Sequence, residues 1–246
     1  MKKEGETMEV RQYAENALTI YMGGDIDEEV NRRLVELKKK IESLDITGLG
    51  EIVISYTSLI VYFDIFETDA GTVERKIGDI DMEALLEGGF EYRLVEIPVC
   101  YGGGYGPDIE NFEADGLSAD EVIETHSGKE YLVYMLGFMP GFPYLGGLDE
   151  KLHKARLETP RVRIPAGSVG IGGKQTGMYP FESPGGWNLI GRTPVPLFDP
   201  GRVEPILYRA GDRIIYRAID EEEYDDIKAS VEAGRYEVKI ESGSDG

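Results

Sequence analysis

The sequence predicts an α+β protein in two parts: an N-terminal part that alternates strands and helices, and a second part that forms a β-barrel. In the first hundred residues, apolar residues recur at strand and helix periods in the order β-α-β-β-α-β. The composition then changes, because nine of the twelve prolines lie between residues 137 and 200, among many glycines. No long helix tolerates that density, so short strands and shaped loops in a closed or nearly closed barrel are expected. We therefore expect domains over 1–100 and 101–246.

The first part is expected to form a ferredoxin-like or related split unit. Asp27 is positioned to cap a helix in which apolar residues recur at helical spacing, with charged residues on the opposite face. The other expected elements are strands at 17–22, 52–54, 59–63 and 92–99 and a helix at 79–87, ended by two glycines. The fold of such a unit does not by itself indicate an activity.

In the second part, a glycine-dense loop at 101–107 marks the boundary. Ser118 followed by Glu121 is a capping-box pattern, which predicts a short helix through Thr125. The remaining expected elements are strands at 131–136, 213–218 and 236–240 and a helix at 221–233.

Bulk properties exclude several function classes. The formal net charge is −21, and a field of that sign repels nucleic acids and anionic membranes, so neither is an expected partner. Cys100 is the single cysteine, so an internal disulfide is excluded, and with two histidines beside it no zinc site is expected. The polar start at 1–6 resembles no signal peptide, and the apolar stretch at 52–63 is too short to span a bilayer. A cytoplasmic protein is expected.

The charge balance reverses between residues 131 and 200. Seven lysines and arginines lie there against five acids, a local charge of +2 in a strongly acidic chain. Arginine binds carboxylate and phosphoryl groups bidentately, so this contrast favours a site for a small anion. The alternative is that these are ordinary surface cations that balance nearby acids.

The glycine-rich segment 165–177 is the second functional candidate. Glycines allow backbone N–H groups to converge on an oxyanion or a phosphate. The segment is not a P-loop, because Ser168 and Gln175 stand where that motif needs glycine and Ser/Thr, and no long helix follows. The alternative is tight turns at a barrel rim.

Two ring-bearing residues complete the candidates. His126 lies between the Ser118 helix and the next strand, where a neutral imidazole can act as a general base or bind substrate. The alternative is a histidine that bonds free carbonyls at a helix end. Trp187, the single tryptophan, either forms the wall of a pocket or anchors the core.

Several long motifs resemble the allophanate hydrolase subunit 1 family. They are YGG with GPD at 101–108, HS at 126–127, GFMPGFPYLGGL at 137–148, PAGSVGI at 165–171, QTGMYP at 175–180, and SPGGW through IGRTP at 183–194. The family includes the B subunit of the ATP-dependent 5-oxoprolinase and the sporulation-kinase inhibitor of bacilli, and the same module is part of urea carboxylase. The resemblance is dense from residue 101 to residue 200.

The resemblance implies an N-terminal α/β domain followed by a cyclophilin-like β-barrel. It implies a partner, the C subunit (or subunit 2 protein) of the same system, and the A subunit completes the oxoprolinase. It also places His126, Arg163 and Gln175 at the family's motif positions, with Tyr179 in the same motif as Gln175.

The leading hypothesis from this resemblance is one subunit of the ATP-dependent 5-oxoprolinase, with a small anionic substrate. In this hypothesis Arg163 holds the substrate carboxylate and His126 moves the proton. The substrate-binding set is completed by Gln175, Tyr179 and the glycine backbone of Gly170, Gly172 and Gly173, which stabilises an oxyanion. The alternatives are a protein that inhibits a histidine kinase by contact and a component of urea or allophanate metabolism.

Overall fold

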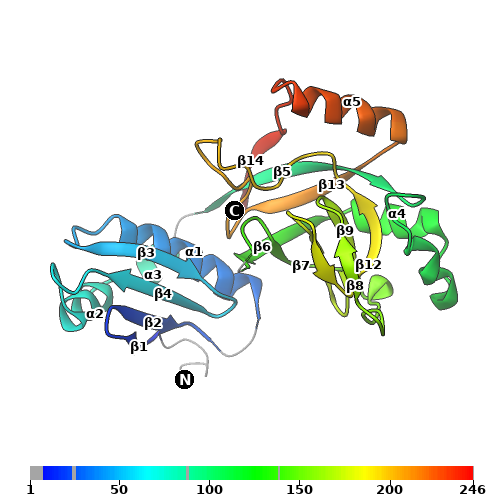
Figure 1. The fold of residues 1–246 in the computed structure, drawn as a ribbon. Coiled ribbons are helices and arrows are strands. Elements are labelled where there is room, and N and C mark those ends of the chain that lie inside the picture. The colour runs from blue at the N-terminus through cyan, green and yellow to red at the C-terminus, as the bar shows by residue number, and fades with distance from the viewer. Residues whose placement is uncertain (1–7, 24–25, 87–88, 138, 246) are drawn as a thin grey trace. The chain divides into compact units, whose positions relative to one another are not determined.

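The computed structural model describes residues 8–23, 26–86, 89–137 and 139–245 (Figure 1). Contacts within the chain divide it into two compact units, Met1–Glu91 with Ser244–Gly246 and Tyr92–Gly243. Both units combine helices with mainly antiparallel sheets, which confirms the α+β class. No helix among the described residues is long and apolar enough to cross a membrane.

The first unit is a four-stranded antiparallel sheet with helices. Its elements are β1 (Glu9–Ala14), β2 (Ala17–Tyr21), α1 (Glu28–Glu42), β3 (Leu49–Ile54), β4 (Ser58–Phe63), α2 (Ala70–Gly78) and α3 (Met82–Leu86), and the strand order is β1-β2-β4-β3. As predicted, Asp27 caps α1, since its carboxylate accepts from the backbone N–H groups of Glu29 and Val30. Buried Leu34 and Ile41 lie on the apolar face of this helix.

The predicted order β-α-β-β-α-β differs from the structure at both ends of this unit and at one additional helix within it. An additional strand, β1, comes first, and it was missed because it is mostly polar and exposed and lacks an apolar alternation. Helix α2 was missed because only Val73 and Ile77 are buried on it. The strand predicted at 92–99 exists as β5 (Phe90–Tyr101), but it pairs with strands of the second unit and not with this sheet.

The second unit is built around an eight-stranded sheet that nearly closes into a barrel. Its further elements are α4 (Ala119–Ser127), β6 (Glu130–Leu136), β7 (Pro143–Gly146), β8 (Arg161–Ile164), β9 (Ser168–Gly172), β10 (Gln175–Met178), β11 (Ser183–Gly185), β12 (Asn188–Arg192), β13 (Arg213–Ile219), α5 (Glu221–Glu232) and β14 (Ile240–Asp245), with 3₁₀ turns at Ile109–Asp115 and Glu150–Leu152. The strand order is β10-β9-β12-β5-β13-β6-β7, with β14 also paired to β5. Strand β7 lies beside β10, so the two ends of the sheet meet.

Buried side chains from nearly every strand fill this barrel. They include Val95 and Ile97 of β5, Val169 and Ile171 of β9, and Ile214 of β13. In Figure 1 the long strand β5 runs beside β13, with which it pairs in parallel from Leu94 to Cys100. The capping box at Ser118 and Glu121 is present at the start of α4, as predicted. The last predicted strand is displaced, since β14 begins at Ile240 and not at residue 236.

Strands β8 and β11 form a separate two-stranded ribbon, and Asp108 ties it to the barrel. One carboxylate oxygen of Asp108 accepts a bond from the Arg161 guanidinium on β8 at 2.6 Å. The other accepts from the Leu189 N–H on β12 at 2.7 Å. Because Asp108 is only 6% exposed, this charged pair is poorly screened, and the ribbon is held in a defined place.

The turn that delivers Asp108 requires glycine at one position. A Cβ at Gly106 would overlap the backbone carbonyl of Ile190, which is itself bonded to Gly102 N–H and cannot move aside. A Cβ at Gly104 meets nothing within 4 Å. The glycines of this loop are therefore not equivalent.

We predict that Gly106→Ala destabilises the second unit by about 3 kcal/mol, because overpacking against backbone is not relieved by a side-chain rotation. Gly104→Ala is the matched control, and we expect it to change stability by less than about 0.5 kcal/mol. Urea unfolding followed by the fluorescence of Trp187 reports this unit selectively, since the chain has one tryptophan. Equal midpoints for the two variants would contradict the role assigned to Gly106.

Candidate functional site

His126 lies inside the barrel. Its side chain is fully buried, and its ring stacks on Tyr216 with a centroid distance of 4.5 Å. Both ring nitrogens are occupied: Nδ1 is 2.8 Å from the Tyr101 hydroxyl and Nε2 is 2.8 Å from the Thr176 hydroxyl. Because the Thr176 hydroxyl donates to the Gly170 carbonyl, it accepts from Nε2–H, and Nδ1 accepts from Tyr101. His126 is therefore a neutral link in an interior chain of hydrogen bonds.

Burial lowers the pKa of His126 from 6.5 to about 3, so the imidazole is neutral at physiological pH. A residue with no exposed surface and two occupied nitrogens has no access to a small molecule in solution. The structure thus corrects the expectation that His126 faces an open site. The alternative, a bond from the histidine ring to carbonyls at the helix end, is not what the structure shows either.

The glycine-rich segment forms the hairpin of β9 and β10 and not a phosphate-binding loop. Gly170 and Gly172 are sheet residues that pair with Gly177 and Gln175 across the hairpin. The N–H of Gly173 donates to the Lys154 carbonyl at 2.6 Å. These groups are engaged in the sheet and its flanking bridge, so they form no open cradle for an oxyanion.

The lack of side chains at these glycines serves another purpose. The indole of Trp187 lies across the hairpin, and a Cβ at Gly172 would overlap its ring atoms. Hypothetical Cβ atoms at Gly170 and Gly177 would lie 3.3 and 3.1 Å from Trp187. The glycines therefore create the flat surface on which the indole packs.

Arg163 and Gln175 are not brought together with His126. Arg163 is mostly exposed on β8, and its Nε lies 2.7 Å from a Glu182 carboxylate oxygen. Gln175 is half-buried at the start of β10. Neither residue is among the described lining residues of the aromatic pocket defined below, so their roles in binding stay predictions. Among the predicted site residues, Tyr179 alone lines the aromatic pocket.

A pocket lined mainly by aromatic side chains lies in the second unit, and we call it the aromatic pocket. It has a volume of about 220 Å³. Its lining residues are the aromatic Phe142, Tyr144, Tyr179 and Trp187, the cationic Arg156, and Gly137, Met139, Pro184, Gly185 and Gly186. Pockets for drug-sized ligands measure roughly 300–1,000 Å³, so this one suits a smaller molecule.

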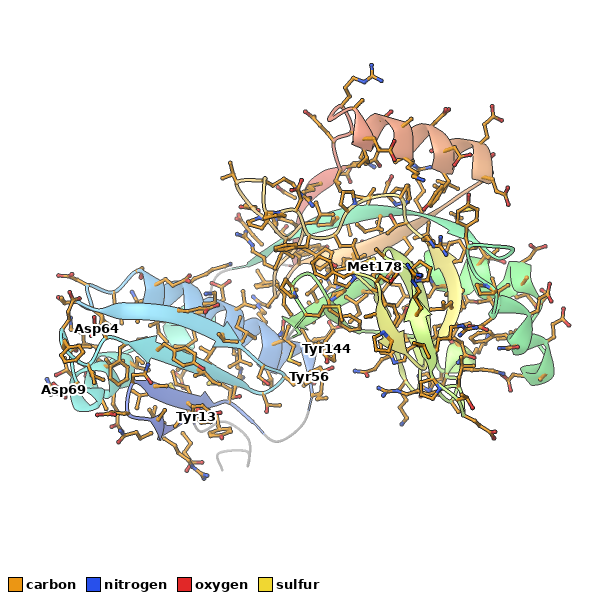
Figure 2. All side chains as sticks on the ribbon, in the orientation of Figure 1. Tyr13, Tyr56, Asp64, Asp69, Tyr144 and Met178 are labelled. Carbon is orange, nitrogen blue, oxygen red and sulfur yellow. The ribbon has the colours of Figure 1, made fainter. Side chains whose placement is uncertain are left out.

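Phe142 is the centre of the aromatic group. Its ring centroid lies 5.5 Å from that of Tyr144, 5.7 Å from Tyr179 and 5.7 Å from Trp187. The contacts to Tyr179 and Trp187 are edge-to-face, the geometry that aromatic quadrupoles favour. Tyr144 extends from β7 (Figure 2), so the pocket lies near the junction where β7 meets β10. Rings locked against one another give the pocket rigid apolar walls.

Arg156 is the one charged residue among the described residues that line the pocket. Its guanidinium carbon lies 6.0 Å from the centroid of the Trp187 ring. Arg161 and Arg163 are each paired with a carboxylate, whereas no ion pair joins Arg156 to an acid in the described part of the chain. The pocket therefore presents one cation that has no counter-ion among the residues the structure describes.

The Tyr179 hydroxyl is the second polar group at the pocket. Burial raises its pKa, so the phenol keeps its proton. A Cβ at Gly185 would lie 2.6 Å from this hydroxyl. Glycine at that position consequently leaves the hydroxyl uncovered by a side chain of the ribbon.

The sequence predicted Tyr179 for the site but not Arg156 or Phe142. Two signals pointed to them: the aromatic density of segment 137–148, and Arg156 in the positive window that also holds Arg163. The choice between the arginines depends on tertiary pairing, which spacing does not report. Within the described residues there is no group of three or more His, Cys, Asp or Glu able to hold a metal ion.

Comparison with protein families gives a match over most of the chain. The family model described as "Carboxyltransferase domain, subdomain C and D" matches residues 8–208. The B subunit of the 5-oxoprolinase of Bacillus subtilis is 41% identical over 227 residues, which cover 88% of this chain and 95% of that protein.

Two solved structures extend the comparison. A conserved uncharacterized protein of Pyrococcus horikoshii is 46% identical, with 87% of this chain and 99% of that chain covered and a TM-score of 0.52. The urea amidolyase of Kluyveromyces lactis covers 99% of this chain with a TM-score of 0.75 and 18% identity, so it shows the fold. This chain corresponds to 17% of that much longer protein.

The buried neutral His126 predicts a pH dependence of stability. Its pKa is lower in the folded protein than in the unfolded chain, so the unfolded chain binds the extra proton and stability falls as pH drops below 6.5. We expect the wild type to lose about 1.4 kcal/mol from this group between pH 7.5 and 5.5. The His126→Gln variant should lack this contribution, although its free energy of unfolding is expected to be lower than that of the wild type at both pH values.

The measurement is urea unfolding by Trp187 fluorescence at the two pH values. The matched control is His153→Gln, which removes the other histidine. It should lose as much stability between pH 7.5 and 5.5 as the wild type. If His126→Gln shows the same loss on acidification as the wild type, His126 is not the group responsible.

Proposed function

Since the chain belongs to the carboxyltransferase domain, subdomain C and D, family, we propose that it is one subunit of an ATP-dependent 5-oxoprolinase. The observation that carries the proposal is the nearly full-length match to the B subunit of the Bacillus subtilis 5-oxoprolinase. The aromatic pocket is consistent with it, because its one unpaired cation suits a small anionic substrate.

The reaction explains why ATP is needed. The carbonyl of 5-oxoproline belongs to a lactam, which resists attack by water. Transfer of a phosphoryl group from ATP to the lactam oxygen makes the carbonyl carbon electrophilic. This transfer releases ADP. Water then adds to that carbon and the C–N bond breaks, which leaves an acyl phosphate. A second water hydrolyses the acyl phosphate to glutamate and phosphate. A protein at this step contributes by holding the lactam in position while charge develops on its oxygen.

In this proposal the chain works in a hetero-complex. The naming of its relatives as the B subunit implies other subunits, and we propose the C subunit (or subunit 2 protein) and the A subunit of the same system as partners. The second unit is proposed to be a cyclophilin-like barrel domain that carries the substrate site. ATP is consumed by the complex in the cytoplasm. The hairpin of β9 and β10 has no P-loop geometry, which favours binding of the nucleotide by another protein of the complex.

The test is reconstitution from the proteins encoded in the same genome. We expect ATP-dependent release of glutamate from 5-oxoproline when this chain is mixed with both proposed partners, and loss of release when this chain is omitted. Release that persists at the full rate without the chain would refute the proposal. Autophosphorylation of a sporulation-type histidine kinase, measured with and without the chain, tests the alternative of an inhibitor.

A further inference from the structure

We infer that the aromatic pocket binds a small flat carboxylate that also carries a carbonyl oxygen, with Arg156 bound to the carboxylate and the Tyr179 hydroxyl donating to the carbonyl. The inference deepens the proposed function, on which it rests, by naming the substrate site and the class of ligand within it. It moves the carboxylate partner from Arg163, which the sequence favoured, to Arg156.

The backbone around Arg156 is held in place on both sides. The N–H of Leu157 donates to the Gly186 carbonyl at 2.7 Å, and the Ala155 carbonyl accepts from the Asn188 side chain at 2.8 Å. Both bonds connect this segment to the stretch that contains Trp187. The backbone of Arg156 is therefore held close to Trp187, and its exposed guanidinium lies over the indole with its hydrogen-bond donors available to a ligand.

The charge of the residues that line the pocket favours an anionic ligand. Aromatic walls alone also suit cations, which bind over the faces of Trp and Tyr rings. The described lining residues include no acid, and a cation already lies over the Trp187 ring. A second cation would be repelled by Arg156 at close range, whereas a carboxylate is attracted to it.

Size and donor number select the class of anion. One guanidinium matches one carboxylate bidentately, but a nucleoside triphosphate carries several charges and requires more donors. A volume of about 220 Å³ also leaves little room for a nucleotide. A five-membered ring is flat and small enough to lie against the rings of Phe142 and Trp187.

The Tyr179 hydroxyl supplies the second contact. The phenol is protonated, so its hydroxyl has a proton to donate. Gly185 leaves the approach to this hydroxyl uncovered, and both residues line the pocket. A ligand carbonyl at this position gains a hydrogen bond from a neutral donor that is fixed by an edge-to-face contact with Phe142.

Trp187 makes the inference directly measurable. It is the single tryptophan of the chain and forms a wall of the pocket, so a bound ligand changes its fluorescence. The full-length chain is titrated with 5-oxoproline, with 2-pyrrolidinone, which lacks the carboxylate, and with cyclopentanecarboxylate, which lacks the carbonyl in the ring. We expect saturable binding in the order 5-oxoproline, cyclopentanecarboxylate, 2-pyrrolidinone. Choline is titrated as the cationic probe and is expected not to bind.

Variants assign the contacts. Arg156→Gln should weaken 5-oxoproline binding about tenfold or more, because it removes a charge-assisted hydrogen-bond pair. It should change 2-pyrrolidinone binding little, since that ligand has no carboxylate. Tyr179→Phe keeps the ring and should reduce the preference for 5-oxoproline over cyclopentanecarboxylate. Lys174→Gln removes an exposed charge outside the pocket and controls for net charge.

Other outcomes overturn the inference. Weaker binding in Arg163→Gln together with wild-type affinity in Arg156→Gln would restore the site favoured by the sequence. Tighter binding of choline than of the carboxylates would show that the pocket selects cations and not anions. Glutamate release by the complex with a KM for 5-oxoproline that is unchanged in Arg156→Gln would refute the pocket while the proposed function stands. Binding of 5-oxoproline to the pocket without glutamate release by the complex would support the pocket and refute the proposed function.

Discussion

The indole of Trp187 packs across the hairpin of β9 and β10, and this packing is possible because Gly170, Gly172 and Gly177 place no side chains under it. Successive residues of a strand point to opposite faces, so Gly170 and Gly172 lie under the indole while Val169 and Ile171 point into the barrel. The pocket depends on this arrangement. A side chain at position 172 would displace the ring, and with it the surface against which Phe142 and Tyr179 pack.

The opposite face of the same hairpin is fixed by polar bonds. Thr176 points inward, where it joins the Gly170 carbonyl to His126, and His126 joins β10 to Tyr101 on β5. Each polar group of this network has a partner, so the network costs little to bury and specifies one register of the hairpin. The aromatic layer outside and the hydrogen-bonded network inside thus hold one pair of strands from both faces.

How far the sequence predicted this molecule depends on the range of the interaction. Local signals were reliable: the caps at Asp27 and Ser118 mark α1 and α4 as predicted, and proline and glycine density indicated the short strands of the barrel. Partner choice was not local. Strand β5 has a clear apolar pattern, but its pairing with β13 joins residues more than a hundred positions apart, and no periodicity reports that.

The site shows the same division. Glycine-rich segment 165–177 was recognised as unusual, but whether its glycines receive an anion or an indole depends on where Trp187 lies. His126 was recognised as a candidate, and its position between a helix and a strand suited both an open site and the core. Among the arginines, the distinction lies in which ones have a carboxylate nearby, and Asp108 and Glu182 reach theirs only in the folded chain.

The parallel pairing of β5 with β13 also has a consequence for biosynthesis. Strand β5 is the first strand of its sheet to leave the ribosome, yet its neighbours β12 and β13 follow only after residues 188 and 213, and β14 later still. The apolar strand therefore has no partner while the residues between 101 and 188 are synthesised, and in that state it can bind chaperones or aggregate. The first unit has its four strands complete by residue 63 and is free of this delay.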